Sequence, residues 1–327
     1  MAVKTYIEAI RETLASEMRR DEAMIILGED VGKKGGVFLA TDGLFDEFGG
    51  ERVLDTPLSE SLIVGAAIGA GVNGLRPVPE IQFADFIFPA FNQILSEAAR
   101  LRYRSNGAFH CPITIRAPYG GGVHGALYHS QSVEAFFAHI PGLKVVIPST
   151  PYDAGGLLRS SIRDDDPVLY FEHKKLYRSL RGEVPDSDYT VPLGQAKVTR
   201  EGSGVTVIAY GMMANYALEA AEIADSEGTS VEVVDLRTLR PLDTDTILDS
   251  VRKTGRAVVV YEDNRFGGYG AEICAILAEE AFDHLDAPVT RVAGPEVPGV
   301  PYSHALEDWF MVNPEKILEA VRTVAAY

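Results

Sequence analysis

The chain has 327 residues, 46% of them hydrophobic, so it exceeds one ordinary domain and can bury a sizeable core. Its formal net charge of −17 argues against nucleic acid or an anionic membrane surface as the main partner. No apolar run approaches the roughly 20 residues that a membrane span needs, and two distant cysteines argue against a disulfide framework.

The N-terminal segment is typical of an amphipathic helix rather than a targeting sequence. Residues 5–20 place apolar side chains at helical spacing, and Thr5 with Glu8 three residues later predicts a capping box. Acidic residues stand where a signal peptide has its basic region. We therefore expect a cytoplasmic protein, although the mature form of an organellar protein would have the same pattern.

Strands and helices then alternate, which predicts a mostly parallel sheet with helices on both faces. Residues 31–50 are rich in glycine and predict a loop with a short helix. The predicted strands of this first series are residues 24–27, 78–83, 113–116, 143–150 and 168–172. Its predicted helices are residues 59–72, 88–104, 133–139 and 153–163.

A change in composition near residues 174–203, where Pro, Gly and acidic residues show little periodicity, predicts a boundary between two domains. We place the first domain at residues 1–185, the linker at 186–203 and the second domain at 204–327. The second domain repeats the alternation. Its predicted strands are residues 204–211, 231–236, 257–263 and 290–294, and its predicted helices are 214–227, 243–254, 270–281 and 314–324.

The string GAGVNG at residues 69–74 has the GxGxxG spacing of dinucleotide-binding loops. Such glycines must follow a strand and open a helix, whereas these end a helix and precede a strand. The small side chains of Gly65, Ala66, Gly69 and Ala70 instead predict close helix packing, which we expect between subunits.

Two histidines, His124 and His129, lie five residues apart in a glycine-rich loop. Metal binding remains an alternative, but neither helical spacing nor an adjacent acid supports it. A loop histidine is better suited to donating a proton or a hydrogen bond, and a structural role also remains open. No GxSxG or Walker motif is present, so nothing indicates a hydrolase or an NTPase.

Glu60 stands at the start of the almost uncharged helix 59–72. A carboxylate there fits a simple role in complementing the helix dipole. It also fits a functional carboxylate, because a charge at the mouth of an almost uncharged helix is costly unless something binds it. The residues themselves leave both interpretations open.

Several strings extend along nearly the whole chain, namely GEDVGKKGGVF, DTPLSE, IQFADFIFPAFNQI, EAARLRYRS, GGGVHGALYHSQS, PGLKVVIPSTPYDAGGLL and VVDLRTLRPLD. They resemble the β subunit of the thiamine-dependent 2-oxo acid dehydrogenases, the decarboxylating first component of the pyruvate and branched-chain complexes. IQFADFIFPAF and GALYHSQS are more similar to the branched-chain members. The resemblance implies an α/β fold, with a thiamine-diphosphate-binding (pyrimidine-type) parallel-sheet domain followed by a transketolase C-terminal-like α/β domain.

The resemblance also implies thiamine diphosphate shared between two chains. The family's α subunit holds the diphosphate through Mg²⁺ with a GDG motif, which this chain lacks. Glu60 matches the glutamate that hydrogen-bonds to N1′ of the aminopyrimidine ring and promotes its imino tautomer. Phe86 matches the aromatic residue that stacks on this ring, and Leu58 and Gln82 match positions that line the same pocket.

Further implied features concern the partners. His129 matches a histidine implicated in passing the acyl group to a lipoyl arm, and a potassium ion is implied at the backbone of Ile113, Ser161, Asp164 and Asp166. The expected assembly is an α₂β₂ heterotetramer that takes a small 2-oxo acid and docks on a lipoyl acyltransferase core. The alternatives are a pyruvate-specific β subunit, a thiamine-diphosphate half enzyme without a lipoyl partner, and a non-enzymatic scaffold.

Overall fold

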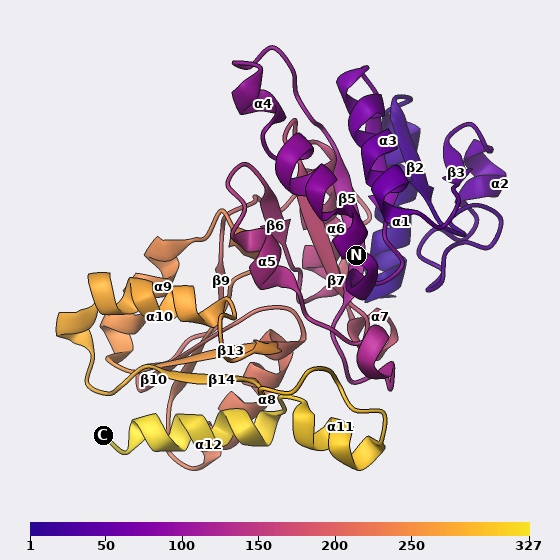
Figure 1. Cartoon of the computed structure of the whole chain (residues 1–327). Coiled ribbons are helices and arrows are strands. Elements are labelled where there is room, and N and C mark those ends of the chain that lie inside the picture. The colour runs from indigo at the N-terminus through magenta and orange to yellow at the C-terminus, as the bar shows by residue number, and fades with distance from the viewer. The chain divides into compact units, whose positions relative to one another are not determined.

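The computed structural model describes all 327 residues and divides into two compact units (Figure 1). The first unit comprises Met1–Tyr119 and Phe136–Leu193, and the second comprises Gly120–Ala135 and Gly194–Tyr327. The predicted division cuts the chain once, between residues 185 and 204. The segment Gly120–Ala135 instead leaves the first series and packs with the second unit, where buried acids hold its backbone.

The first unit is built on parallel strands in the order β6-β7-β5-β4-β2-β3. Except for the edge strand β3, these strands are almost continuously buried, as expected for a parallel sheet with both faces covered. Separately, β1 (Ala2–Thr5) pairs antiparallel with β8 (Arg181–Val184). The sheet strands are β2 (Met24–Gly28), β3 (Val53–Asp55), β4 (Arg76–Glu80), β5 (Thr114–Tyr119), β6 (Lys144–Val146) and β7 (Val168–His173).

Four helices of the first unit begin within two residues of their predicted starts, whereas the short helix at Leu176–Ser179 was not predicted. At the start of α1 (Tyr6–Arg20), the Thr5 hydroxyl accepts from the Glu8 N–H and the Glu8 carboxylate accepts from the Thr5 N–H at 2.7 Å, so the predicted capping box is confirmed. Helix α1 packs on α6 (Pro151–Ile162), and α3 (Glu60–Val72) packs on β2 and β4. The remaining helices are α2 (Leu44–Phe48), α7 (Leu176–Ser179) and α5 (Glu134–Ala138), whose first two residues belong to the second unit.

The glycine-rich helix α3 ends, as predicted, just before a strand. Gly71 is buried, and a Cβ there would lie 3.2 Å from Ile113. A Cβ at Gly69 would meet nothing within 4 Å. Gly69 therefore has room within this chain, and the predicted contact with another subunit stays a prediction.

The predicted helix at residues 88–104 is wrong as a single element. The chain forms a 3₁₀ turn η2 (Phe88–Ala90), a π-helical turn η3 (Gln93–Ala98) and a short α4 (Leu101–Arg104). The N–H of Ala99 donates to the carbonyl of Ile94, five residues back, at 3.0 Å. Apolar spacing indicates a helix here but does not reveal an extra residue in one turn.

The second unit has strands in the order β14-β13-β10-β11-β9, parallel except for β9. Strand β9 (Lys197–Arg200) lies within the predicted linker and pairs antiparallel with β11. Its β-branched Val198 and Thr199 suit an edge strand. The other strands are β10 (Val205–Ala209), β11 (Val231–Asp235), β13 (Ala257–Asn264) and β14 (Thr290–Gly294), with a short β12 (Thr238–Arg240) after β11.

Five helices complete the second unit, and one of them was not predicted. Helix α8 (Met212–Ser226) packs on α12 (Pro314–Ala325), whereas α9 (Thr244–Thr254) and α10 (Gly270–Glu280) contact each other. The unpredicted helix is α11 (His304–Phe310), which at 7 residues is too short to show a clear period. None of the chain's helices combines the length and apolarity that crossing a bilayer requires.

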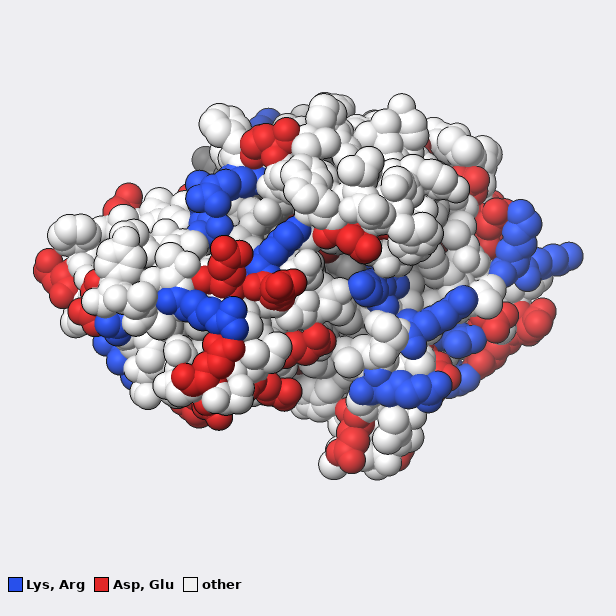
Figure 2. All heavy atoms as spheres, turned by 90° about the horizontal axis from the view of Figure 1, so that it is seen from below, with Lys and Arg blue, Asp and Glu red and all other residues white.

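Charged side chains are mixed on the face drawn in Figure 2, where Asp and Glu lie among Lys and Arg. No broad basic area without acidic neighbours is visible on that face. This face therefore lacks the uniform positive field that holds a phosphate backbone.

Candidate functional site

The candidate site lies at the carboxyl ends of β2, β3 and β4, which are neighbours in the first sheet. In open α/β sheets this edge is where ligands bind. The loops that follow the strands contact one another there. Gln82 Nε2 donates to the carbonyl of Glu29 at 3.4 Å, and the N–H of Gly32 donates to Asp55 Oδ1 at 2.7 Å.

Glu60 is the first residue of α3 and is half-buried, with Ser59 as N-cap. Burial, then the charge of Asp30 and then the charge of Glu60 raise the pKa of Glu29. The carboxylates of Glu60 and Glu29 are therefore near each other. We did not single out Glu29 from the sequence. An acid directly after a buried strand, in the string GED, is the signal that could have found it.

Aromatic and apolar side chains lie beside this edge of the sheet. Phe86 ends the turn η1 (Ala84–Phe86) and is half-buried, with its ring centroid 5.6 Å from that of Phe83 in an edge-to-face arrangement. The Ser61 hydroxyl donates to the carbonyl of Pro89 at 2.5 Å, so the start of α3 lies beside the turn after Phe86. Leu58, just before the helix, is 72% exposed. The fold thus brings the predicted residues Leu58, Glu60, Gln82 and Phe86 to one region of the first unit.

One buried group in this region lacks a partner. The Thr56 hydroxyl oxygen is buried and has no hydrogen-bond partner. Buried hydroxyls are normally hydrogen-bonded. A polar ligand bound at this edge of the sheet would supply the missing hydrogen bond to the Thr56 hydroxyl.

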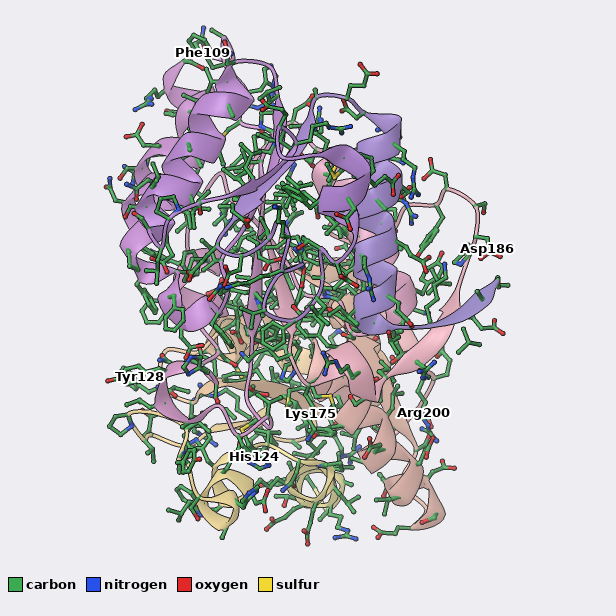
Figure 3. The ribbon with its side chains drawn as sticks, turned by 90° about the vertical axis from the view of Figure 1, so that its right-hand side faces the viewer. Phe109, His124, Tyr128, Lys175, Asp186 and Arg200 are labelled. Atoms are coloured by element: carbon green, nitrogen blue, oxygen red, sulfur yellow. The ribbon has the colours of Figure 1, made fainter.

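His129 belongs to the second unit, on the loop that Figure 3 shows through His124 and Tyr128. It is half-buried and follows the short turn η4 (Ala126–Tyr128). The loop is closed at its base, where the N–H of Gly120 donates to the carbonyl of Gln131 at 3.0 Å. Glu262 accepts there from the N–H of Gly121 at 2.6 Å and from the Ser132 hydroxyl at 3.2 Å.

The two loop histidines do not form a metal cluster. No group of three or more His, Cys, Asp or Glu side chains in the chain is arranged to hold a metal ion. The ring nitrogen Nδ1 of His124 pairs with the carboxylate of Glu307. The His124 ring is therefore held against a carboxylate of the protein itself.

The residues predicted to hold potassium come together at the turn before β7. The N–H of Asp164 donates to the carbonyl of Ser161 at 3.2 Å, and the N–H of Val168 donates to the carbonyl of Ile113 at 3.0 Å. The N–H of Asp166 donates to Asp164 Oδ1 at 2.8 Å. A carbonyl oxygen keeps a second lone pair, and oxygen donors suit a hard cation, so the donor types fit the predicted ion. The Asp164 carbonyl, however, already accepts a hydrogen bond from the Arg76 guanidinium at 2.8 Å.

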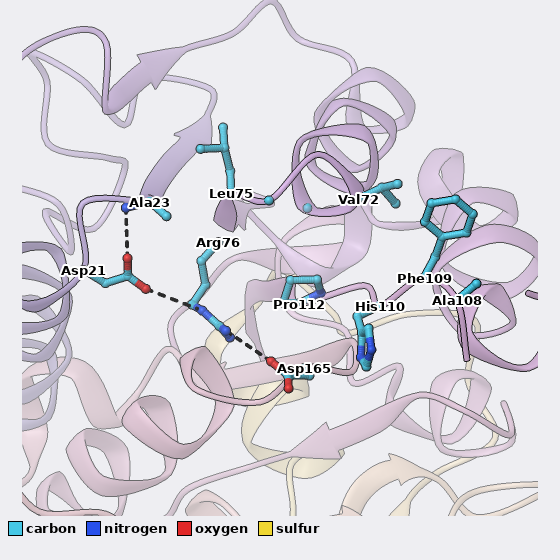
Figure 4. Close-up of a pocket in the computed structure, with 12 residues that line it drawn as sticks. Asp21, Ala23, Val72, Leu75, Arg76, Ala108, Phe109, His110, Pro112 and Asp165 are labelled. Atoms are coloured by element: carbon cyan, nitrogen blue, oxygen red, sulfur yellow. Dashed lines mark hydrogen bonds and ion pairs between the residues drawn. The ribbon is translucent and has the colours of Figure 1, made fainter. Parts of the chain in front are cut away.

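A cavity of about 400 Å³, drawn in Figure 4, lies near the amino ends of β2 and β4, away from Glu60, Gln82 and Phe86 and beside the turn predicted to hold potassium. Arg76 crosses it and contacts Asp21 at 3.6 Å and Asp165 at 3.1 Å. Its Nη1 also donates to the carbonyls of Ile162 and Asp164 at 2.8 Å. Because the Arg76 guanidinium is already paired with groups of the protein itself, nothing in this cavity indicates a catalytic or ligand-binding role.

Near the base of the histidine-bearing loop, Glu134 is a fully buried acid. Tyr210 donates its hydroxyl to Glu134 Oε1 at 2.8 Å, whereas Oε2 is buried without a hydrogen-bond partner. Burial first, and then the charges of Asp263 and Glu262, raise the pKa of Glu134 to about 8. Burial likewise raises the pKa of Asp263 to about 6.

We expect Glu134→Gln to flatten the pH dependence of stability. A folded-state pKa of about 8, above the ordinary 4.5, means that the folded chain holds the proton more tightly than the unfolded chain. This stabilisation is complete below pH 4.5 and is lost as pH rises through about 8, a change on the order of 5 kcal/mol. Glutamine mimics the protonated form, so the variant keeps its stability at high pH.

The measurement is the urea midpoint of the chain at several pH values from 5 to about 8.5. The exposed Glu319→Gln serves as the control and should follow the wild type. Parallel curves for Glu134→Gln and the wild type would show that Glu134 is ionised throughout, against this interpretation.

Comparisons with known proteins agree with this architecture. Residues 3–179 match the transketolase pyrimidine-binding domain, and residues 194–317 match the transketolase C-terminal domain. The chain is 56% identical to the 2-oxoisovalerate dehydrogenase subunit beta of Bacillus subtilis (strain 168) over 100% of both chains. It is 51% identical to the pyruvate dehydrogenase E1 component subunit beta of the same organism, also over 100% of both chains.

Among solved structures, the chain is similar to a split-gene transketolase described as an inactive beta4 tetramer. The TM-score is 0.80 at 26% identity, and 98% of each chain is covered. The predicted fold class is thereby confirmed. The first matched domain contains Glu60, Gln82, Phe86 and His129.

Proposed function

Because this chain belongs to the β subunits of the thiamine-diphosphate-dependent 2-oxo acid dehydrogenases, we propose that it forms half of a decarboxylase for branched-chain 2-oxo acids. In this proposal the enzyme releases CO₂ and transfers the remaining acyl group to a lipoyl group, which is reduced. The observation that carries the proposal is the 56% identity over the full length to a 2-oxoisovalerate dehydrogenase subunit beta.

The residues at the sheet edge suit the pyrimidine half of the cofactor. Thiamine diphosphate supplies, when bound, the electron sink for decarboxylation. Glu60 would hold a proton at N1′ of the aminopyrimidine, for which a carboxyl side chain is suited as a general acid or base. Phe86 would stack on the ring, and Leu58 and Gln82 would line its pocket.

The other half of the site would come from a second chain. This sequence has no GDG motif, so an α subunit would hold the diphosphate through Mg²⁺ in an α₂β₂ heterotetramer. His129 would donate a hydrogen bond or proton near the lipoyl sulfur as the acyl group arrives. Potassium at the carbonyls of Ile113, Ser161, Asp164 and Asp166 would stabilise the turn before β7.

The experiment is reconstitution with an α subunit, with a lipoyl domain as acceptor. We expect kcat/KM for 2-oxoisovalerate to exceed that for pyruvate by about tenfold or more, because an apolar pocket distinguishes methyl groups to roughly this extent. Equal values, or a preference for pyruvate, would favour a pyruvate dehydrogenase. Failure to acylate the lipoyl domain would favour a half enzyme without a lipoyl partner.

The reconstituted heterotetramer also tests whether potassium binds. If potassium binds, the unfolding midpoint in KCl is higher than in choline chloride at equal ionic strength. Identical midpoints would remove the potassium site from the proposal.

A further inference from the structure

The loop at residues 120–132, which we call the histidine loop, has an unusual backbone. Four of its residues have positive φ, namely Gly120 (86°), Gly122 (73°), His124 (58°) and Ala126 (53°). For His124 and Ala126 this left-handed conformation is unfavourable, because each has a Cβ. The surrounding protein must therefore hold the loop in this conformation.

Glu307 of α11 binds the middle of the histidine loop through hydrogen bonds. Its side chain is only 1% exposed, and one carboxylate oxygen accepts from the N–H of Gly122 at 3.1 Å and from the N–H of His124 at 3.2 Å. The other oxygen contacts His124 Nδ1. On the far side, the His124 ring packs against His304, with 3.8 Å between centroids. A single buried carboxylate thus fixes both the backbone and the ring of His124.

The part of the loop that Glu307 binds is in direct contact with the backbone of His129. A Cβ at Gly125 would lie 2.6 Å from the carbonyl oxygen of His129 and 2.8 Å from the Ser130 hydroxyl, so the two arms of the loop touch at this glycine. The N–H of His129 also donates to the carbonyl of Ala126 at 3.5 Å. A displacement of residues 122–125 therefore moves the backbone that carries His129.

We infer that Glu307 is a positioning residue for His129. It acts through the backbone of the histidine loop, whereas Glu262 closes the base of the loop through Gly121 and Ser132. A buried carboxylate with several N–H donors forms strong, charge-assisted hydrogen bonds. The inference rests on the proposed role of His129 in acyl transfer.

The test compares Glu307→Ala, Glu307→Gln and the exposed control Glu319→Gln in the reconstituted heterotetramer. We expect Glu307→Ala to slow acylation of a lipoyl domain by about 10²-fold, the loss that a misplacement of about 1 Å can cause. Decarboxylation with an artificial electron acceptor should be unchanged. Glu307→Gln keeps an acceptor oxygen for the two N–H groups, so it should recover part of the acylation rate.

Hydrogen exchange provides a readout that does not depend on activity. In Glu307→Ala, amides at residues 120–132 should exchange faster, while those of β10 and β13 keep the protection seen in the wild type and in Glu319→Gln. Unchanged exchange in the histidine loop overturns the inference. So does an equal loss of decarboxylation and acylation.

His129→Ala, measured in parallel, separates this inference from the proposed function. Normal lipoyl acylation by His129→Ala means that the proposed role of His129 is wrong, and positioning by Glu307 falls with it. A defective His129→Ala beside a normal Glu307→Ala means that only the positioning role is wrong.

Discussion

Glu60→Gln lowers decarboxylation by the reconstituted complex by at least about 10²-fold, the usual contribution of a positioned acid or base. Glutamine keeps the size of the side chain and can still hydrogen-bond, but it cannot exchange a proton with N1′ of the pyrimidine ring. Assembly with the α subunit should be unaffected, because Glu60 is half-buried at a helix start and no internal salt bridge of the chain depends on it. The measurement is CO₂ release with saturating thiamine diphosphate.

Two further variants make the Glu60 result specific. Glu51→Gln removes an exposed acid from the same unit and should leave turnover at the wild-type rate. Glu60→Asp keeps the charge but shortens the side chain by one methylene, and it should also be slow. Decarboxylation by Glu60→Gln at the wild-type rate would contradict the assignment of Glu60 and leave it as an acid that complements the helix dipole.

His129→Ala separates two activities that the wild-type enzyme couples. We expect acylation of a lipoyl domain to fall by about 10²-fold or more, since the donor near the lipoyl sulfur is removed. Decarboxylation with an artificial electron acceptor should continue, because Glu60 and the pyrimidine pocket belong to other segments of the chain. Lipoyl acylation is followed by the mass of the lipoyl domain, and decarboxylation by reduction of the acceptor.

The control for this variant is His139→Ala, an exposed histidine outside the histidine loop. Both of its activities should match the wild type. Equal losses of acylation and decarboxylation in His129→Ala would instead assign His129 a structural role.

Local patterns in the sequence were sufficient to predict much of the fold. The capping box of Thr5 and Glu8, and the start of α3 at Ser59, involve residues three apart, so they can be predicted without tertiary structure. Alternation of apolar strands with helices predicted the parallel sheets. Glu60 itself could be placed at a helix start, but only the family resemblance gave it a cofactor.

Long-range contacts account for what the sequence did not reveal. Glu307 follows the loop residues it holds by more than 180 positions, and α11 is too short to show a period. The π-helical turn at Gln93–Ala98 depends on packing that apolar spacing does not encode. Glu29 becomes notable only because the sheet order places the ends of β2 and β4 side by side.

The central claim is that this chain is one half of an enzyme that acylates lipoyl groups. The most direct measurement is the mass of a lipoyl domain incubated with the reconstituted α and β chains, thiamine diphosphate and 2-oxoisovalerate. We expect addition of a branched acyl group, and no addition when either chain is left out. An unmodified lipoyl domain in a mixture that releases CO₂ would contradict it.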